Sequence, residues 1–313
     1  MNLKKIIMRY GTIIALALIF AACSIGVQGF FDSSNLINIL TQIALLMIIA
    51  QGFTMVHIVG EMDLSFANVA SLSAVIVAGL LIKGMNPFLA ILICLLGGAL
   101  FGLINGLLVT RLGIPSLITT LAMGIIATGL IYMYTKGVSF YSGMPKSFLY
   151  LGRGRIGPIP VLVLIMLAVL AVCHIFINKT VAGSHLQATG GNPSAARLAG
   201  INTRFYKILG FVLCSVAGAF TGILLTSRLG AANPEGAGGF LMESFAIVLL
   251  GQTVSSMGRP SPFGTFIGAL IIGIVNNGLT LLGAEYFMQD IVKGLIIILA
   301  VVISSVQTKR MKA

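Results

Sequence analysis

Residues 179–207 read KTVAGSHLQATGGNPSAARLAGINTRFYK and form the longest polar interval in a chain that is otherwise mostly apolar. The interval contains several basic residues and no acidic one. Its central Gly-Gly-Asn-Pro run predicts a turn. Residues 194–199 then read as a short helix that Asn192 can cap, with Pro193 at its first position and Gly200 at its end. Two interpretations stay open: a basic helix that a cytosolic protein contacts, or an ordinary loop whose charge reflects membrane topology alone.

The composition identifies the surroundings of the chain. Hydrophobic residues make up 58% of it, charged residues make up 8%, and its mean hydropathy is +1.08. Soluble domains average roughly 25% charged residues, so this chain cannot cover a water-exposed surface with polar groups. We therefore expect an integral membrane protein that contacts the lipid bilayer. The formal net charge of +12 does not indicate nucleic-acid binding, because no basic run is long enough to follow a phosphate backbone.

Apolar windows long enough to cross a bilayer core of about 30 Å predict an all-α polytopic membrane protein with about ten transmembrane helices. The third and eighth windows contain polar residues, so straight spans and broken or re-entrant helices both stay open for them. The first window also resembles a lipoprotein leader ending at Cys23, but its apolar character continues to Phe31, which favours an uncleaved helix. The windows are residues 10–30, 36–59, 64–82, 87–110, 115–135, 158–178, 207–228, 240–257, 262–282 and 289–306.

Lysine and arginine give the predicted orientation, since they are enriched in cytoplasmic loops. If the N-terminus is inside and successive windows alternate in direction, twelve of the lysine and arginine residues lie in cytoplasmic segments and six lie outside. Lys293 falls within the last window. Both termini and residues 179–207 are therefore predicted to be cytoplasmic. Residues 136–157 are predicted to form the main external loop.

A weak internal repeat divides the chain. Residues 98–113 resemble residues 268–283 without gaps, and residues 65–69 resemble residues 244–248. Each pair matches two helices of opposite direction, as an inverted-topology repeat of helices 2–5 and helices 7–10 requires. Chance similarity between glycine- and leucine-rich helices is the competing interpretation.

The whole chain, residues 1–313, is accordingly predicted to be a single transmembrane domain. Its first repeat covers about residues 36–135 and its second about residues 207–306. The interval at residues 179–207 links the sixth helix to the second repeat.

Polar and charged residues in or beside the windows are candidates for a translocation path, because such groups are costly in a membrane. Asp63 also suits a structural role as the cap of the helix that follows it. For the amides, the competing interpretation is hydrogen bonding between helices, worth about 0.6 kcal/mol on average. The candidates are Glu61, Asp63, Ser65, Asn68, Asn105, Glu243, Asn276 and Asn277.

Motifs for catalysis are missing from the sequence. There is no GxxxxGK[ST] phosphate loop, no HExxH metal motif and no convincing pairing of a nucleophile with a base. We expect no catalytic residue, no metal site and no cofactor, with any ATP hydrolysis in a separate chain. Gly98, Gly102 and Gly106 follow one another at four-residue spacing and predict a face for close helix packing.

Three stretches resemble a known family. They are residues 60–65 (GEMDLS), residues 188–201 (ATGGNPSAARLAGI), and residues 263–270 (FGTFIGAL) with residues 276–279 (NNGL). The sequence resembles the membrane permease subunit of bacterial ATP-binding-cassette importers for simple sugars, the ribose, xylose and galactose group. Glu61 departs from many relatives, which have a small residue there. Autoinducer-2 importers are also relatives, so the resemblance leaves the solute open.

The resemblance implies a permease of the bacterial inner membrane that forms the path for a pentose or hexose and works by alternating access. Its partners would be a cytosolic ATP-binding-cassette ATPase, a second identical or related permease, and a periplasmic or extracellular sugar-binding protein. Residues 188–201 would form the coupling helix that contacts the ATPase. The coupling residues would be Gly190, Gly191, Asn192, Ala195, Ala196, Arg197, Gly200 and Ile201.

Two other function classes stay open on the residues alone. A secondary transporter driven by protons would use Glu61, Asp63 or Glu243. A structural or assembly protein of the membrane would use the polar interval as a binding surface.

Overall fold

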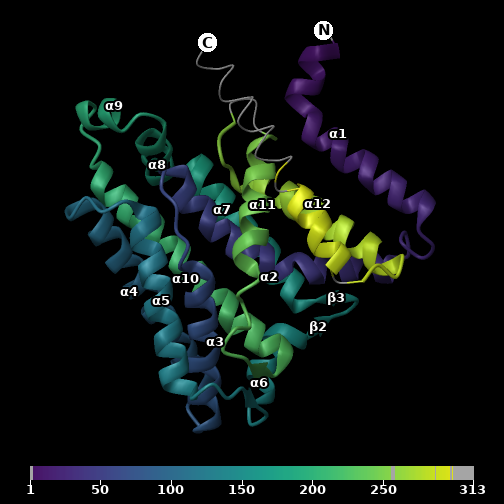
Figure 1. The fold of residues 1–313 in the computed structure, drawn as a ribbon, viewed down its shortest axis with the longest axis horizontal. Helices are drawn as coiled ribbons and strands as arrows, with labels where there is room; N and C mark the ends of the chain where they lie inside the picture. The colour runs from purple at the N-terminus through teal and green to yellow at the C-terminus, as the bar shows by residue number, and fades with distance from the viewer. Residues whose placement is uncertain (1–2, 255–257, 286, 297, 299–313) are drawn as a thin grey trace.

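The computed structural model describes residues 3–254, 258–285, 287–296 and 298, with side chains from residue 11 onward. Helix α10 (Thr203–Leu229) lies at the centre of the fold and packs against α2 (Ser33–Ile58), α3 (Phe66–Ile82) and α4 (Pro87–Arg111), as Figure 1 shows. Every residue from 43 to 50 of α2 is buried. A helix that is apolar on all sides is buried in a protein core or spans a membrane, and α2 lies in the core, packed against α7, α10, α11 and α12.

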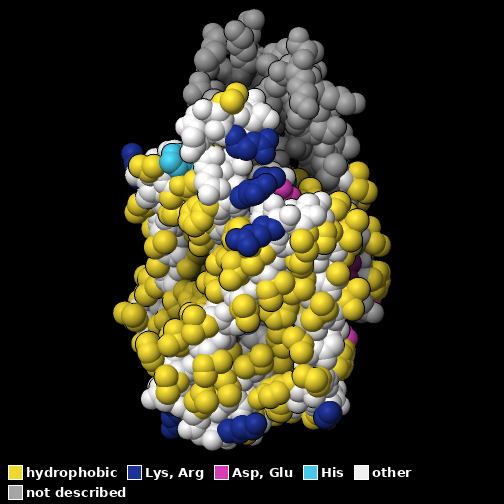
Figure 2. All heavy atoms as spheres, turned by 90° about the vertical axis from the view of Figure 1, so that its left-hand side faces the viewer, with side chains coloured by type: hydrophobic (Ala, Val, Ile, Leu, Met, Phe, Trp, Pro, Cys, Tyr) yellow, Lys and Arg dark blue, Asp and Glu magenta, His cyan; other side chains and the backbone are white. Residues whose placement is uncertain are grey.

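Several helices instead turn apolar residues outward. In their most apolar stretch, α4 is 22% buried, α5 (Ser116–Thr135) 33% and α7 (Val161–Lys179) 22%. Figure 2, which views the α4–α5 side, shows a wide hydrophobic band with basic side chains above and below it. Six of the described helices are long and apolar enough to cross a membrane. The chain is therefore a multi-pass membrane protein, as its composition predicts.

The remaining predicted windows also coincide with helices. They correspond to α1 (Leu3–Gly26), α3, α11 (Phe240–Gln252), α12 (Pro262–Leu281) and the helical residues 287–296. Helix α11 has 13 residues and is about 20 Å long, shorter than a bilayer core of about 30 Å. The end of the last window, residues 299–306, lies outside the described residues. Ten spanning helices thus stay a prediction.

Two helices and a set of short strands lie in the intervals that the sequence indicates only as loops. Helix α6 (Lys146–Arg153) and the hairpin of β2 (Arg155–Ile156) and β3 (Ile159–Pro160) occupy the predicted external loop. Strand β1 (Phe140–Tyr141) pairs antiparallel with β4 (Ala231–Ala232). Helix α8 (Val181–Gly191) fills the first half of the polar interval, and α9 (Pro193–Leu198) follows it.

The glycine face predicted on α4 is confirmed. A Cβ atom at Gly102 would lie 2.5 Å from the carbonyl oxygen of Phe211, and one at Gly98 would lie 2.9 Å from that of Ser215. Both distances are shorter than any van der Waals contact, so α4 and α10 approach with their backbones nearly touching. The partner residue number falls along α10 as the glycine number rises, which makes the two helices antiparallel.

We expect Gly102→Ala to lower the free energy of unfolding by about 1–3 kcal/mol, because the methyl group forces α4 away from α10. Thermal unfolding of the purified protein in detergent measures this. Gly97→Ala is the matched control, since a Cβ atom at Gly97 meets nothing within 4 Å. Equal melting temperatures for the two variants would contradict the packing argument.

Candidate functional site

Local signals in the sequence build the α8–α9 corner. The side chain of Thr180 accepts from the backbone N–H of Gly183 at 3.0 Å and caps α8. Asn192 leaves the helical conformation, and its side chain accepts from the N–H groups of Ser194 (3.1 Å) and Ala195 (3.0 Å). Pro193 occupies the first turn of α9, as predicted. Gly200 follows the helix with a φ of 81°, a conformation that favours glycine.

Helix α9 presents most of its surface to the outside. Among the predicted coupling residues, Gly191, Asn192, Ala195, Arg197 and Gly200 are exposed, Gly190 and Ile201 are half-buried, and Ala196 is buried. Leu198 is 92% exposed, the highest value among the large hydrophobic residues of the described chain. An exposed leucine beside an exposed arginine is suited to protein contact. The motif contains Leu198, but its position as the apolar tip of α9 becomes apparent only from the structure.

Helix α8 joins this corner to the body of the molecule through backbone contact. A Cβ atom at Gly190 would lie 1.8 Å from the carbonyl oxygen of Ile58, at the end of α2. Only glycine allows the two helix ends to meet so closely. The Nδ1 atom of His185 lies 2.7 Å from the hydroxyl of Tyr206 on α10, which gives α8 a second attachment. These two contacts connect α9, through α8, to the ends of α2 and α10.

An ion pair holds the segment that follows α2. The ammonium of Lys207 on α10 donates to the carboxylate of Glu61, and both side chains are largely buried, at 27% and 13% exposure. Glu61 therefore does not stand free as a proton carrier. It ties the break between α2 and α3 to the first turns of α10, directly beside the point where Gly190 contacts α2.

Reversing one charge tests this pair. Lys207→Glu places two carboxylates together and should lower stability by about 1–3 kcal/mol, between the values typical of exposed and buried pairs. The exchanged double variant Glu61→Lys with Lys207→Glu should recover much of the loss. Melting temperatures in detergent give both numbers. Lys179→Glu, which changes an exposed lysine on α7, controls for net charge; a loss as large in that control would contradict the pairing.

Three of the predicted path residues meet inside the protein. Asp63, Ser65 and Asn105 are each fully buried. One carboxylate oxygen of Asp63 accepts from the N–H (2.7 Å) and the hydroxyl (2.6 Å) of Ser65, and the Asn105 amide donates to that hydroxyl at 2.9 Å. The helix begins at Phe66 with Ser65 as its N-cap residue, so Asp63 does not occupy the cap position that we predicted for it. It closes the turn before the helix instead, because its side chain reaches the N–H two residues ahead.

The remaining path candidates make no side-chain hydrogen bond to this cluster in the described part of the chain. The Asn68 amide donates to the hydroxyl of Thr128 at 2.8 Å, joining α3 to α5. Asn277 and Asn35 exchange two hydrogen bonds of 2.9 Å between α12 and α2. The side-chain oxygen of Asn276 is buried without a hydrogen-bond partner among the described residues. The sequence thus identifies polar positions but not which of them come together.

Glu243 has a different setting. It lies 2.7 Å from the ammonium of Lys293 and lines a cavity of about 440 Å³ between α11, α12 and residues 287–296. Asp290 also lines this cavity and contacts the same ammonium at 3.5 Å. Charges near the apolar interior of a membrane protein are usually paired and often line a polar route.

Comparison with known proteins identifies the family of the chain. Residues 35–301 match the protein family described as "Branched-chain amino acid transport system / permease component". The chain belongs to this family of transport permeases. Its similarity to individual members extends over nearly the whole length. No solved structure matches it at a significant level.

The names of several similar proteins state the sugar that they transport. The ribose import permease of Bacillus subtilis (strain 168) is 36% identical over 299 residues, which cover 95% of this chain and 93% of that protein. The ribose import permease of Escherichia coli (strain K12) is 34% identical over 305 residues, covering 96% and 95%. The D-allose transport system permease of the same strain is 33% identical over 304 residues, covering 96% and 93%. The resemblance predicted from the three motifs is confirmed.

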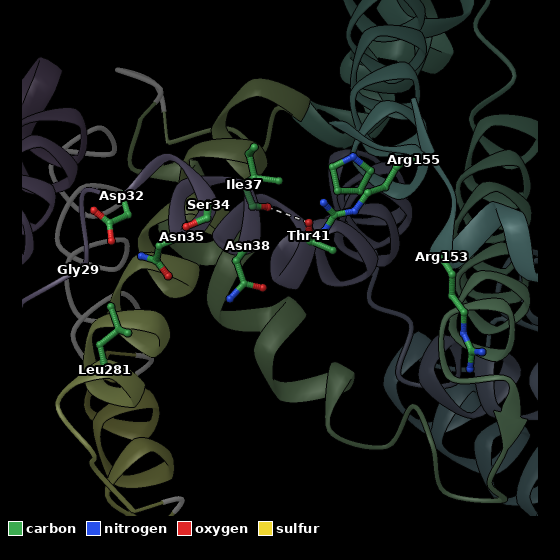
Figure 3. A pocket seen from close by; sticks show the side chains of 12 residues that line it. Gly29, Asp32, Ser34, Asn35, Ile37, Asn38, Thr41, Arg153, Arg155 and Leu281 are labelled. Carbon is green, nitrogen blue, oxygen red and sulfur yellow. Dashed lines mark hydrogen bonds between the residues drawn. The ribbon is translucent and has the colours of Figure 1, made fainter. Parts of the chain in front are cut away.

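The permease also has a polar cleft at the opposite end from α9. It measures about 560 Å³ and lies where the start of α2 meets α6, β2 and the end of α12 (Figure 3). The polar side chains that line it are Asp32, Ser34, Asn35, Asn38, Thr41, Arg153 and Arg155. This group was not predicted from the sequence. Its members come from two segments more than a hundred residues apart, and no motif links them.

Proposed function

We propose that this permease is the membrane-spanning subunit of an ATP-driven importer and forms the path for a monosaccharide. The observation that carries the proposal is the similarity at 33–36% identity to ribose and allose permeases over at least 93% of both chains. The permease carries out no covalent chemistry in this scheme. ATP hydrolysis takes place in a separate cytosolic ATPase.

The proposed location is the bacterial inner membrane, with both termini and α9 in the cytosol. The distribution of lysine and arginine between the two sets of loops supports this orientation. The N-terminal end of α1 and the α8–α9 corner lie at the same end of the molecule in Figure 1, while the α6 and β-strand end lies opposite. That opposite end would receive a sugar-binding protein from the periplasm or the outside.

Helix α9 is proposed to contact the ATPase. Its support is the exposed pair Arg197 and Leu198 on a short helix whose start is fixed by Asn192. A second permease, identical or related, would complete the membrane part of the transporter. Two copies of α9 would then contact two ATPase domains.

The inverted repeat stays a proposal, and three pairs of elements support it. Helices α2 and α10 are the long central helices of the two halves and pack against each other. Helices α3 and α11, with 17 and 13 residues, are the short members that follow them. Helices α4 and α12 each start with a proline behind a side-chain cap, Asn86 in one and Ser261 in the other. Rocking of the two halves would give alternating access.

Of the path candidates, we propose Glu243 and Asn276 as those closest to a solute route. Glu243 lines a cavity, and the side-chain oxygen of Asn276 is buried without a partner in the described part of the chain; Asp63 and Asn105 also have one such oxygen each, but both take part in the hydrogen bonds at Ser65. Ser65, Asn68, Asn105 and Asn277 bond across elements and would hold the helices in register, while Asp63 bonds to Ser65 and would hold the turn before α3. Glu61 would hold the break against α10.

Reconstitution tests the function directly. The permease is placed in vesicles with the ATPase and sugar-binding protein of the same transport system, and uptake of radiolabelled ribose is followed with and without ATP. We expect uptake that requires ATP and that excess leucine leaves unchanged. Uptake that follows a proton gradient without ATP would contradict the proposal. Inhibition by leucine would instead favour the amino-acid solute in the family's description.

A further inference from the structure

The cleft between α2 and β2 has a framework that is already fixed by hydrogen bonds. The Arg153 guanidinium donates from Nε to the carbonyl of Arg228 at 2.8 Å and also donates to that of Leu229, which holds α6 on the end of α10. The Asn35 amide donates to the carbonyl of Phe30 at 2.8 Å and is paired with Asn277. These contacts hold both walls of the cleft without using all of its polar groups.

Besides the hydroxyl of Ser34, three side chains in the cleft have no hydrogen-bond or ion-pair partner within the described part of the chain: the carboxylate of Asp32, the amide of Asn38 and the guanidinium of Arg155. Figure 3 shows Asp32 and Arg155 on opposite sides of Asn38. The three groups therefore surround one space and offer it an acceptor, a mixed donor and acceptor, and a donor.

This combination suits one kind of solute. A sugar hydroxyl donates one hydrogen bond and accepts others, so a neutral polyol can satisfy the carboxylate, the amide and the guanidinium at once. The volume of about 560 Å³ falls within the range of about 300–1,000 Å³ that small-molecule sites occupy. The carboxylate of Asp32 disfavours an anion in this space, although Arg153 and Arg155 together leave the cleft with one excess positive charge.

We propose that the α2–β2 cleft is a weak binding site for a neutral monosaccharide, which the solute occupies before it crosses the membrane. The inference rests on the proposed function and adds a place of contact to it. An acidic side chain of a docked sugar-binding protein is the main competing occupant, since Arg153 and Arg155 both border the cleft.

Saturation-transfer NMR tests the site on the full chain in lipid nanodiscs, with ribose as the probe and no other protein present. We expect transfer to ribose from the unmodified chain and about a tenfold loss of affinity in Asn38→Leu and in Arg155→Met. Both residues are exposed, so neither change empties a core. Gln42→Leu is the matched control, because Gln42 is an exposed amide one turn further along α2 and outside the cleft; it should bind ribose as the unmodified chain does.

Two results would overturn the site. One is the absence of transfer, or equal transfer in all four proteins. The other is unchanged ribose transfer in Arg155→Met together with weaker binding of the sugar-binding protein, which would make the cleft a docking surface. ATP-driven ribose uptake by the unmodified transporter is measured alongside. Uptake without ribose transfer rejects the site alone, whereas the absence of uptake rejects the proposed function as well.

Discussion

Changing Arg197 to Glu and Leu198 to Ser together is expected to abolish association of the permease with its ATPase. Leu198 is 92% exposed and is the apolar tip of α9, and Arg197 is exposed beside it. Arginine is among the residues that contribute most of the energy of an interface, up to several kcal/mol each, and burial of an exposed leucine contributes about 1.5–3 kcal/mol. A loss of about 3–4 kcal/mol weakens binding by several hundredfold. Co-purification from membranes that contain both proteins measures the effect.

The folding of this double variant should be unchanged, because both side chains point away from the core. Its melting temperature should therefore equal that of the unmodified permease within error. Lys146→Glu controls for charge reversal, since Lys146 is exposed on α6 at the other end of the molecule. Full recovery of the ATPase with the double variant would remove α9 from the proposed interface.

Changing Gly190 to Ala is expected to have the opposite pattern, in which the ATPase binds but transport fails. The added methyl group would lie 1.8 Å from the carbonyl oxygen of Ile58, so α8 must move away from the end of α2. The exposed face of α9 is unchanged by this, and binding of the ATPase should persist. We expect ATP-driven ribose uptake to fall at least about tenfold, because a displacement of about 1 Å can cost that much or more.

Uptake and co-purification are measured on the same vesicles to separate the two effects. Ser184→Ala is the control, since Ser184 is exposed on the same helix. Normal uptake by Gly190→Ala would show that the contact between α8 and α2 does not transmit motion. Loss of ATPase binding in the same variant would show that α8 and α9 cannot move separately.

The fold was predictable where the signal is local and repeated. Long apolar windows coincide with helices because length and composition alone determine a membrane span. Asn192, Pro193 and Gly200 define α9 because capping involves residues within one turn. Helices α6 and α8 escaped prediction because they are short and have few apolar residues, and packing against α7 and α10 stabilises them.

The candidate site was predictable only in part, for the same reason. Their charge at the edge of a membrane span marked Glu61 and Asp63 as functional candidates, but the fold determines which residues they contact. Lys207 is distant from Glu61 in the sequence and meets it through the packing of α10. The contact between Gly190 and Ile58 likewise depends on how closely two helix ends approach. A single sequence contains no local signal for either contact.

The length of α10 and the contacts at its two ends limit how such a protein can be altered. It has 27 residues, a length of about 40 Å. Near one end Lys207 holds the segment before α3, and near the other Arg228 donates to the carbonyl of Thr41 while the carbonyls of Arg228 and Leu229 accept from Arg153. Helix α10 is thus bonded to neighbouring segments at both of its ends. A loop at one face of the membrane contacts one end of α10. Replacing that loop with the loop of a relative should therefore succeed only when the residues that bond the other end of α10 are replaced as well.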